Sequence, residues 1–213
     1  MRHAVLVLSA TACLCLHGRA DAQDTLTPFP RVVVDLHGIV PVFPNDNEQL
    51  ADSRSIQVAQ LPGAGFGGRV GVHVYLFKWK AITFGVGGEA FSARSTSAPD
   101  TSLGLASVTE RLTSADGQIS LNFGSGHGWS YLSGGVGGSQ WSIIPAGQSA
   151  GPSDIESLPT ANYGGGAHWS IKKHLGFSLD VRIYEIKPGN PTSTGPGSPR
   201  TRLLVVGAGI FLK

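Results

Sequence analysis

The chain has 213 residues, 30 of them glycine, and its 16 Lys and Arg against 14 Asp and Glu leave a formal net charge of +2 at pH 7. So balanced a charge gives no electrostatic basis for binding nucleic acid, and we expect no nucleic-acid partner. Glycine is present at about twice its usual frequency, which disfavours helices and suits tightly curved strands.

The start of the chain has the features of a secretory signal. Met1-Arg2-His3 is a short basic beginning, and Ala4–Leu16 is an apolar run of signal length. That run is too short to cross a bilayer as a helix. Small residues at Ala20 and Ala22 suit signal peptidase, so we expect cleavage after Ala22. The predicted organisation is a signal peptide over residues 1–22 and one domain over residues 23–213, which contains neither of the two cysteines.

After the signal, strand-like apolar segments are joined alternately by long polar connections and by very short ones. The long connections are rich in Pro, Ser, Gly and Asn and cover residues 43–64, 94–117, 142–160 and 187–200. The tight ones cover residues 77–80, 124–128 and 172–174. A β-barrel in an outer membrane has short periplasmic turns and longer outer loops. The rhythm therefore predicts such a barrel, with both termini on the periplasmic side.

Alternation with period 2 is the signature of a membrane strand, because lipid-facing and lumen-facing side chains alternate along it. It is clearest over Leu175–Tyr184, where the odd-numbered positions are all aliphatic or aromatic. It is also present over residues 31–42, 66–76, 82–90 and 162–171, and at 118–123 for the end of a further strand. Residues 129–140 and 202–212 are apolar or glycine on both faces, so their facing stays open. The predicted fold class is all-β, an eight-stranded antiparallel transmembrane up-and-down β-barrel with short periplasmic turns and long outer loops.

Charged residues and histidines fall on the faces predicted to point into the barrel. An eight-stranded barrel has an interior about wide enough for its own side chains, and buried charges need partners. We therefore expect a polar network in the lumen, formed by Arg31, Asp35, His37, Arg69, His73, Glu89, Asp180 and Arg182. Two interpretations remain open: structural pairing, or the gate of a narrow channel for small solutes.

Aromatic residues fall near the ends of the predicted strands. Tryptophan and tyrosine are enriched at the two interfaces of a membrane. We predict one belt at the short turns, formed by Trp79, Trp129 and Trp169, and a second beside the long loops, formed by Phe91, Trp141 and Tyr184. Tryptophans also occur at strand ends in soluble proteins, which is the alternative explanation.

Two segments carry a resemblance to a known family. The aromatic-then-glycine strand Trp129–Gly138 and the hairpin Asn162–Tyr184, with its Gly-x-Gly strand and basic turn, resemble the OmpA- and OmpX-like eight-stranded barrels. The resemblance implies location in the outer membrane of a Gram-negative-type bacterium. It also implies contact with outer-membrane lipid including lipopolysaccharide, and with the barrel-assembly machinery. Such barrels usually end in an aromatic residue that this machinery reads, whereas here Phe211 is followed by Leu212 and Lys213.

Catalytic and metal signatures are weak. His168-Trp169-Ser170 is similar to the His-x-Ser pair of lipid A deacylases, but Arg182 stands where that family has its acid. His37 and His73 point inward on neighbouring strands without the four convergent ligands of structural zinc. We expect no catalysis, no metal and no cofactor.

The predicted role is structural or a surface interaction, with an unknown partner meeting the outer loops. The loops' composition suggests exposure and mobility. Two alternatives stay open, namely a narrow gated channel and a soluble lipocalin-like barrel with its aliphatic faces turned inward around a ligand.

Overall fold

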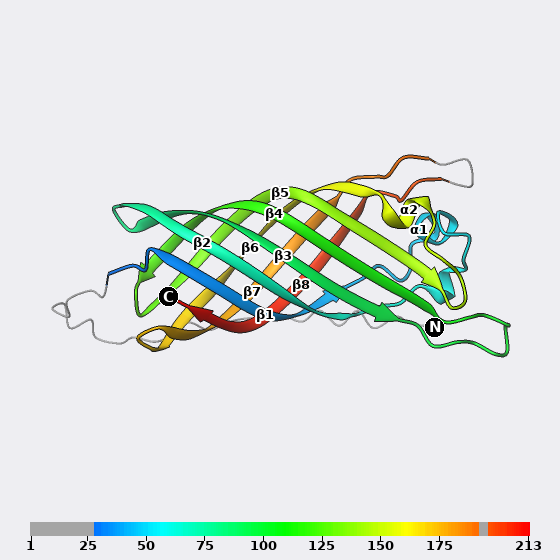
Figure 1. Cartoon of the computed structure of the whole chain (residues 1–213), viewed down its shortest axis with the longest axis horizontal. Helices are drawn as coiled ribbons and strands as arrows, with labels where there is room; N and C mark the ends of the chain where they lie inside the picture. Colours follow the sequence, from blue (N-terminus) through cyan, green and yellow to red (C-terminus); the bar gives the residue numbers. More distant parts are fainter. Residues whose placement is uncertain (1–27, 192–195) are drawn as a thin grey trace, which may run out of the picture.

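The computed structural model describes residues 28–191 and 196–213 of the chain, so the expected signal peptide and its cleavage site lie outside the described residues. The chain forms one closed barrel in which every strand pairs antiparallel with its neighbour in sequence, and the last strand pairs with the first (Figure 1). The predicted eight-stranded antiparallel fold is confirmed. The strands are β1 (Val32–Val42), β2 (Phe66–Trp79), β3 (Ile82–Thr96), β4 (Val108–Ser125), β5 (Gly128–Pro145), β6 (Ser157–Lys172), β7 (Leu175–Ile186) and β8 (Thr201–Leu212).

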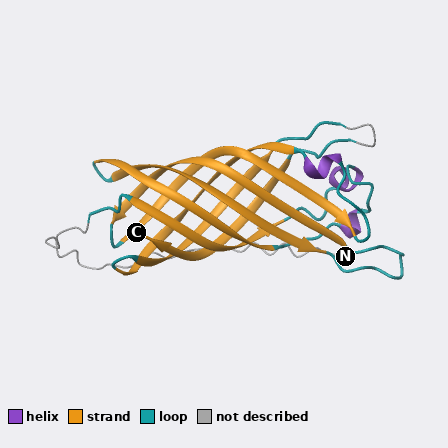
Figure 2. Cartoon of the chain, in the orientation of Figure 1, coloured by secondary structure: helices purple, strands orange, loops and turns teal. Residues whose placement is uncertain are grey.

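The long and short connections lie at opposite ends of the barrel. The short turns β2–β3, β4–β5 and β6–β7 form one end, which we call the short-turn end. The long loops form the outer end, where the only helical turns of the described residues gather (Figure 2). These are α1 (Glu48–Asp52), a 3-10 turn (Val58–Gln60) and α2 (Pro152–Ile155). No helix of residues 28–191 and 196–213 has the length and apolar character needed to span a membrane.

Four strands run farther toward the outer end than the sequence predicted. The segment 94–117 was expected to be a loop, but β3 continues to Thr96 and β4 begins at Val108. In this region Leu112 points inward, while Arg94 and Arg111 are exposed. Alternation therefore persists with the apolar face turned inside, the opposite of the pattern in the middle of the barrel. A search for apolar outward faces cannot detect such a segment.

Along the middle of the barrel the aliphatic faces point outward. In β1, Val32, Leu36 and Val40 are 46%, 58% and 43% exposed, whereas Val33 and Ile39 between them are fully buried. The same alternation settles the two strands whose facing was open. In β5 the odd-numbered Trp129 points inward, and in β8 the odd-numbered Phe211 does.

The interior has three levels. Next to the short turns lies an aromatic cluster of Val33, Tyr75, Trp129 and Phe211, with Phe29 packed beneath it. Polar and charged side chains fill the middle. Toward the outer end lies an apolar cluster in which the barrel wall and loop residues pack together, with members that include Ile39, Phe43, Leu50, Leu61, Leu112, Trp141 and Tyr184.

Candidate functional site

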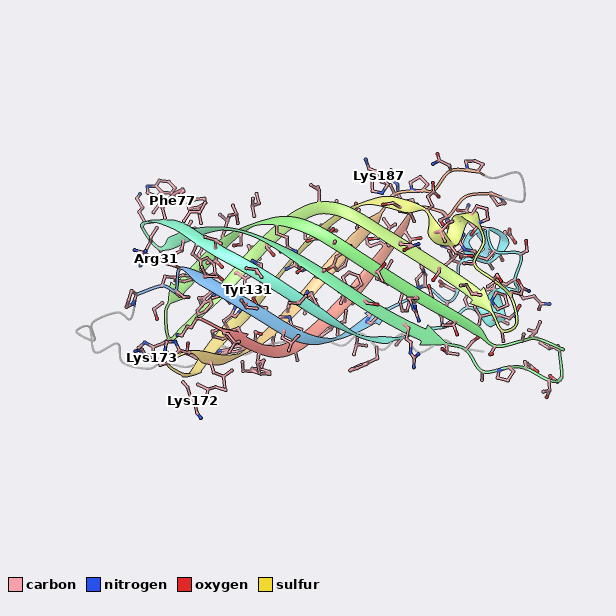
Figure 3. All side chains as sticks on the ribbon, viewed as in Figure 1. Arg31, Phe77, Tyr131, Lys172, Lys173 and Lys187 are labelled. Atoms are coloured by element: carbon pink, nitrogen blue, oxygen red, sulfur yellow. The ribbon has the colours of Figure 1, made fainter. Side chains whose placement is uncertain are left out.

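Seven of the eight residues predicted for the lumen network do lie in the lumen, and one does not. Asp35, His37, Arg69, Glu89, Asp180 and Arg182 are buried, and the side chain of His73 is 12% exposed. Arg31 is exposed at the short-turn end, one residue before β1 (Figure 3). The aromatic cluster accounts for this correction. Phe29 packs on Tyr75 and Trp129 with ring centroids 4.7 and 5.0 Å apart, so the lumen is closed above the level of Arg31.

The centre of the lumen is an ion-pair network around Asp180. This carboxylate accepts hydrogen bonds from Arg69 at 2.6 Å, from the Tyr131 hydroxyl at 2.6 Å and from Arg182 at 3.2 Å. Glu89 lies 3.8 Å from Arg69 and 3.5 Å from Arg182, and it accepts a hydrogen bond from Tyr184. Two guanidinium groups thus face two carboxylates across the barrel, which is what buried charges require.

Neutral partners accept two further hydrogen bonds from Arg182, while its buried Nε has no hydrogen-bond partner. Its guanidinium donates to Asn162 Oδ1 and to Ser133 Oγ, both at 2.8 Å. Sequence reasoning missed Tyr131, Ser133 and Asn162 as members of the network. For Asn162 the signal was present, since it shares the inward face of β6 with His168.

A second polar group surrounds Asp35, closer to the short turns. His168 Nε2 donates to Asp35 Oδ1 at 2.8 Å, and Nε2 of His73 and of His37 lie 3.6 and 3.9 Å from the same carboxylate. His37 Nδ1 lies 2.7 Å from an Arg69 nitrogen, which can only donate, so His37 Nε2 carries the proton and donates to Ser178 Oγ. The two polar groups are therefore linked through His37. No cluster suited to holding a metal ion occurs among the described residues.

The histidine and serine of the His168-Trp169-Ser170 motif lie on one face but have separate partners. The His168 ring stacks on Trp129 at 4.6 Å, with its Nε2 engaged by Asp35. Ser170 Oγ donates to the Gly126 carbonyl at 2.9 Å and accepts from Lys213 Nζ at 2.6 Å. Burial at this spot lowers the pKa of Lys213. Ser170 therefore contacts Lys213 and not His168, so the histidine is not placed as the base of a His-x-Ser pair.

Side chains leave little free space in the lumen. A cavity between Tyr75, Tyr131 and His168 measures about 10 Å³, which is about the smallest space that holds one water molecule. This cavity is too small to hold a solute larger than water.

The outer mouth is covered by loops that fold onto the barrel. We call residues 43–64, 146–156 and 196–200 the outer cap. Arg54 lies at its centre and donates to Asp154 Oδ1 at 2.8 Å, to the Trp141 and Ser153 carbonyls at 3.1 and 3.0 Å, and to Ser198 Oγ at 2.9 Å. A single side chain thus joins three segments. The composition of these loops suggested mobility, whereas the structure shows apolar residues such as Leu50 anchored inside the barrel mouth.

The predicted aromatic belts need correction. Trp79 and Trp169 are on the exterior at the short-turn end, 59% and 48% exposed. The other four are buried inside the barrel, so they contact no interface: Trp129, Phe91, Trp141 and Tyr184. Two of these could have been placed from the sequence, because Phe91 and Tyr184 share the parity of inward-facing Glu89 and Arg182.

Comparisons with solved structures agree with the fold. Neisserial surface protein A (NspA) has a TM-score of 0.57 and 13% identity, over 86% of this chain and 97% of that protein. Ail of Yersinia pestis (TM-score 0.46, 13% identity, 84% and 95% covered) and the N-terminal barrel of Pseudomonas aeruginosa OprF (0.42, 12%, 84% and 96%) align less well. These structural neighbours are small eight-stranded outer-membrane barrels, and the match to NspA shows that the chain shares their fold. No protein-family model matches the chain, and no curated protein matches it significantly.

Proposed function

We propose that the chain is an integral protein of the bacterial outer membrane with a structural or surface-interaction role and no catalytic activity. The observation that carries the proposal is the distribution of side chains in the middle of the barrel, which is the inverse of that in a soluble protein. Its outside is aliphatic, with Ile119 and Val136 70% and 71% exposed, while its inside holds Arg69, Asp180 and Arg182. A soluble protein rarely exposes a continuous apolar surface of this kind, whereas hydrocarbon requires it.

The same inversion argues against a soluble lipocalin-like barrel. Such a protein keeps its aliphatic faces inside around a ligand. Here the aliphatic residues of the middle point away from a charged interior. A closed barrel leaves no strand edge unpaired, which is the condition for crossing a bilayer with β-structure.

The filled interior supports a structural or surface role over transport. Ion pairs occupy the centre, the aromatic cluster lies below it, and the outer cap covers the mouth. A conducting state would have to separate Asp180 from two arginines and move the cap as well. The surface that remains for a partner is the outside of the cap and the outer ends of the strands. NspA, which shares the fold, is described as a surface protein.

Fractionation of cells that express the full chain tests the location. We expect the folded protein to sediment with outer membranes and to change its gel mobility on boiling. A heat-insensitive protein in the aqueous fraction would refute the proposal.

Planar-bilayer recording tests the role. The filled barrel should show no reproducible opening, and stepwise conductance would instead establish the gated channel. Unchanged lipid A after overexpression is the expected result for a protein that is not a lipid-modifying enzyme.

A further inference from the structure

The two turns β2–β3 and β6–β7 share an arrangement that the ion-pair network and the outer cap do not explain. A bulge between Tyr75 and Phe77 in β2 changes which residues face out, so that Phe77 is 58% exposed and Trp79 59% exposed at the end of the strand. Lys78 and Lys80 are interleaved with these aromatics and are exposed. The turn thus presents aromatic and basic side chains in alternation.

The β6–β7 turn repeats the arrangement on the opposite side of the barrel. A bulge between Ser170 and Lys172 interrupts the register of β6. Trp169 and Ile171 are 48% and 67% exposed just before the exposed Lys172 and Lys173. The same combination of bulge, exposed apolar residues and two lysines therefore occurs in two hairpins of different sequence.

Together with Arg31 these lysines form a basic rim at the short-turn end. Figure 3 labels Arg31, Lys172 and Lys173 at this end. We define the basic rim as Arg31, Lys78, Lys80, Lys172 and Lys173. None of the five makes an ion pair within the described residues. The only specific contact of the rim lysines to a charged or aromatic group there is the Lys80 ammonium, 5.4 Å from the Trp79 ring centroid.

Acidic residues are distributed quite differently. Within the described part of the chain, every Asp and Glu lies either inside the barrel or at the outer end. Those inside are Asp35, Glu89, Glu110, Asp116 and Asp180. Those at the outer end are Asp46, Glu48, Asp52, Asp100, Asp154, Glu156 and Glu185. At the outer end the exposed Arg202 pairs with Glu185 at 2.7 Å, whereas no Asp or Glu side chain of the described residues lies at the basic rim.

The position of the rim along the barrel axis indicates which ligand it contacts. Exposed tryptophans beside an aliphatic band sit at the level of lipid headgroups. Lys78 and Lys80 are one residue from Trp79, and Lys172 is three residues from Trp169. At the rise per residue of a strand, the backbone of each of these lysines is therefore about 3–10 Å from the backbone of an exposed tryptophan. The lysines are therefore placed at the phosphates of the adjoining leaflet rather than deep in the periplasm. An acidic protein would meet a surface that is already lined by lipid.

We propose that the basic rim binds the phosphate groups of anionic phospholipids in the leaflet next to the short turns. This inference rests on the proposed membrane location. Lipid contact at this rim would fix the depth and tilt of the barrel, because the two hairpins lie on opposite sides of the barrel and would both bind lipid in the same leaflet.

Spin-labelled lipids test the proposal on the full chain reconstituted in phosphatidylcholine bilayers. The electron-spin spectrum separates the lipids immobilised at the protein from the bulk lipid, for labelled phosphatidylglycerol and labelled phosphatidylcholine in turn. For the unaltered protein we expect phosphatidylglycerol to be enriched about threefold at the protein. This is below the roughly fivefold attraction of one Lys or Arg at an anionic surface, because only part of the lipid shell touches the rim.

Two variants with the same loss of charge separate the rim from net charge. Lys78→Gln, Lys80→Gln, Lys172→Gln and Lys173→Gln together should reduce the enrichment to near one. Arg94→Gln, Arg111→Gln, Lys187→Gln and Arg200→Gln together remove as much charge from the outer end, and this variant should keep most of the phosphatidylglycerol enrichment. All eight side chains are exposed, and heat-modifiable mobility checks that both variants fold.

The outcomes are distinguishable. Absence of any immobilised lipid component would refute the membrane location and this inference with it. Immobilised lipid without selectivity, or equal losses in the two variants, would overturn the inference and leave the location standing. Rim-dependent binding of a fluorescent polyglutamate peptide in neutral nanodiscs, without lipid selectivity, would assign the rim to an acidic protein instead.

Discussion

The substitution Asp180→Asn tests whether the lumen network holds the barrel together. Asp180 is 1% exposed and accepts three hydrogen bonds, two of them from the guanidinium groups of Arg69 and Arg182. Asparagine has almost the same shape but one carbonyl oxygen and no charge. One arginine keeps an acceptor, and the other faces an amide NH₂ that cannot accept.

The magnitude follows from the bonds lost. Hydrogen bonds to charged groups contribute about 1.5–3 kcal/mol each, and one is removed while another weakens. The remaining carboxylate, Glu89, is 3.5 Å from Arg182 and 3.8 Å from Arg69, too far to replace them. Removing one partner of a buried ion pair typically costs about 3–5 kcal/mol, and we expect a loss of unfolding free energy in this range.

Urea unfolding in detergent micelles, followed by heat-modifiable mobility, measures the loss. Asp46→Asn is the matched control, because Asp46 is exposed and should change stability by less than about 0.5 kcal/mol. A loss below about 1 kcal/mol for Asp180→Asn would show that the two arginines are satisfied without it. Conductance in this variant without a loss of stability would point to a gate rather than a structural pair.

Three further substitutions test the cap, the close contacts in the barrel wall and the exterior. Arg54→Gln removes the ion pair to Asp154 and should expose the cap to protease while the barrel keeps its heat-modifiable mobility, whereas Arg94→Gln should leave the cleavage rate unchanged. Gly166→Ala would place a Cβ against the Leu179 carbonyl and should lower unfolding free energy by about 1–3 kcal/mol, whereas Gly117→Ala meets nothing within 4 Å and should be tolerated in the same urea titration. Ile119→Lys puts a charge on the lipid face and should cost about 2–4 kcal/mol in a lipid bilayer, and a neutral result would contradict the membrane placement.

The architecture and much of the lumen could be predicted because they depend on parity. An apolar exterior and a charged interior impose opposite preferences on alternate residues, and β7 displays this with Leu179 outside and Asp180 and Arg182 inside. The strand facing then follows from counting. Partners across the barrel could not be predicted. Tyr131 and Asp180, for example, are 49 residues apart in the sequence, and their contact depends on how the strands between them are shifted along one another.

Most of the wrongly placed aromatic residues lie near strand ends, where they were assigned from a general expectation about interfaces and not from the alternation along the strand. Phe91 and Tyr184 were assigned to an interfacial belt because they lie beside long loops. Parity places both inside, and they contact one another there at 5.0 Å between ring centroids. The outer cap was missed for a different reason: its segments are joined by Arg54 through backbone carbonyls and serines, which have no sequence pattern.

The reversal of alternation along β4 shows that this barrel has two stabilising regions of different kinds. Toward the short turns Ile119 faces out and Ser120 faces in, whereas toward the outer end Arg111 faces out and Leu112 faces in. The inside is closed to bulk solvent at both levels, so the difference must come from the outside. In the proposed membrane location, water surrounds the outer level, and hydrophobic burial can therefore stabilise it as in a soluble protein. Hydrocarbon would surround the middle level and offer no such gain, so cohesion there would depend on hydrogen bonds and ion pairs across the lumen. Replacing Asp180 should consequently weaken the middle of the barrel while the apolar cluster beneath the cap stays intact.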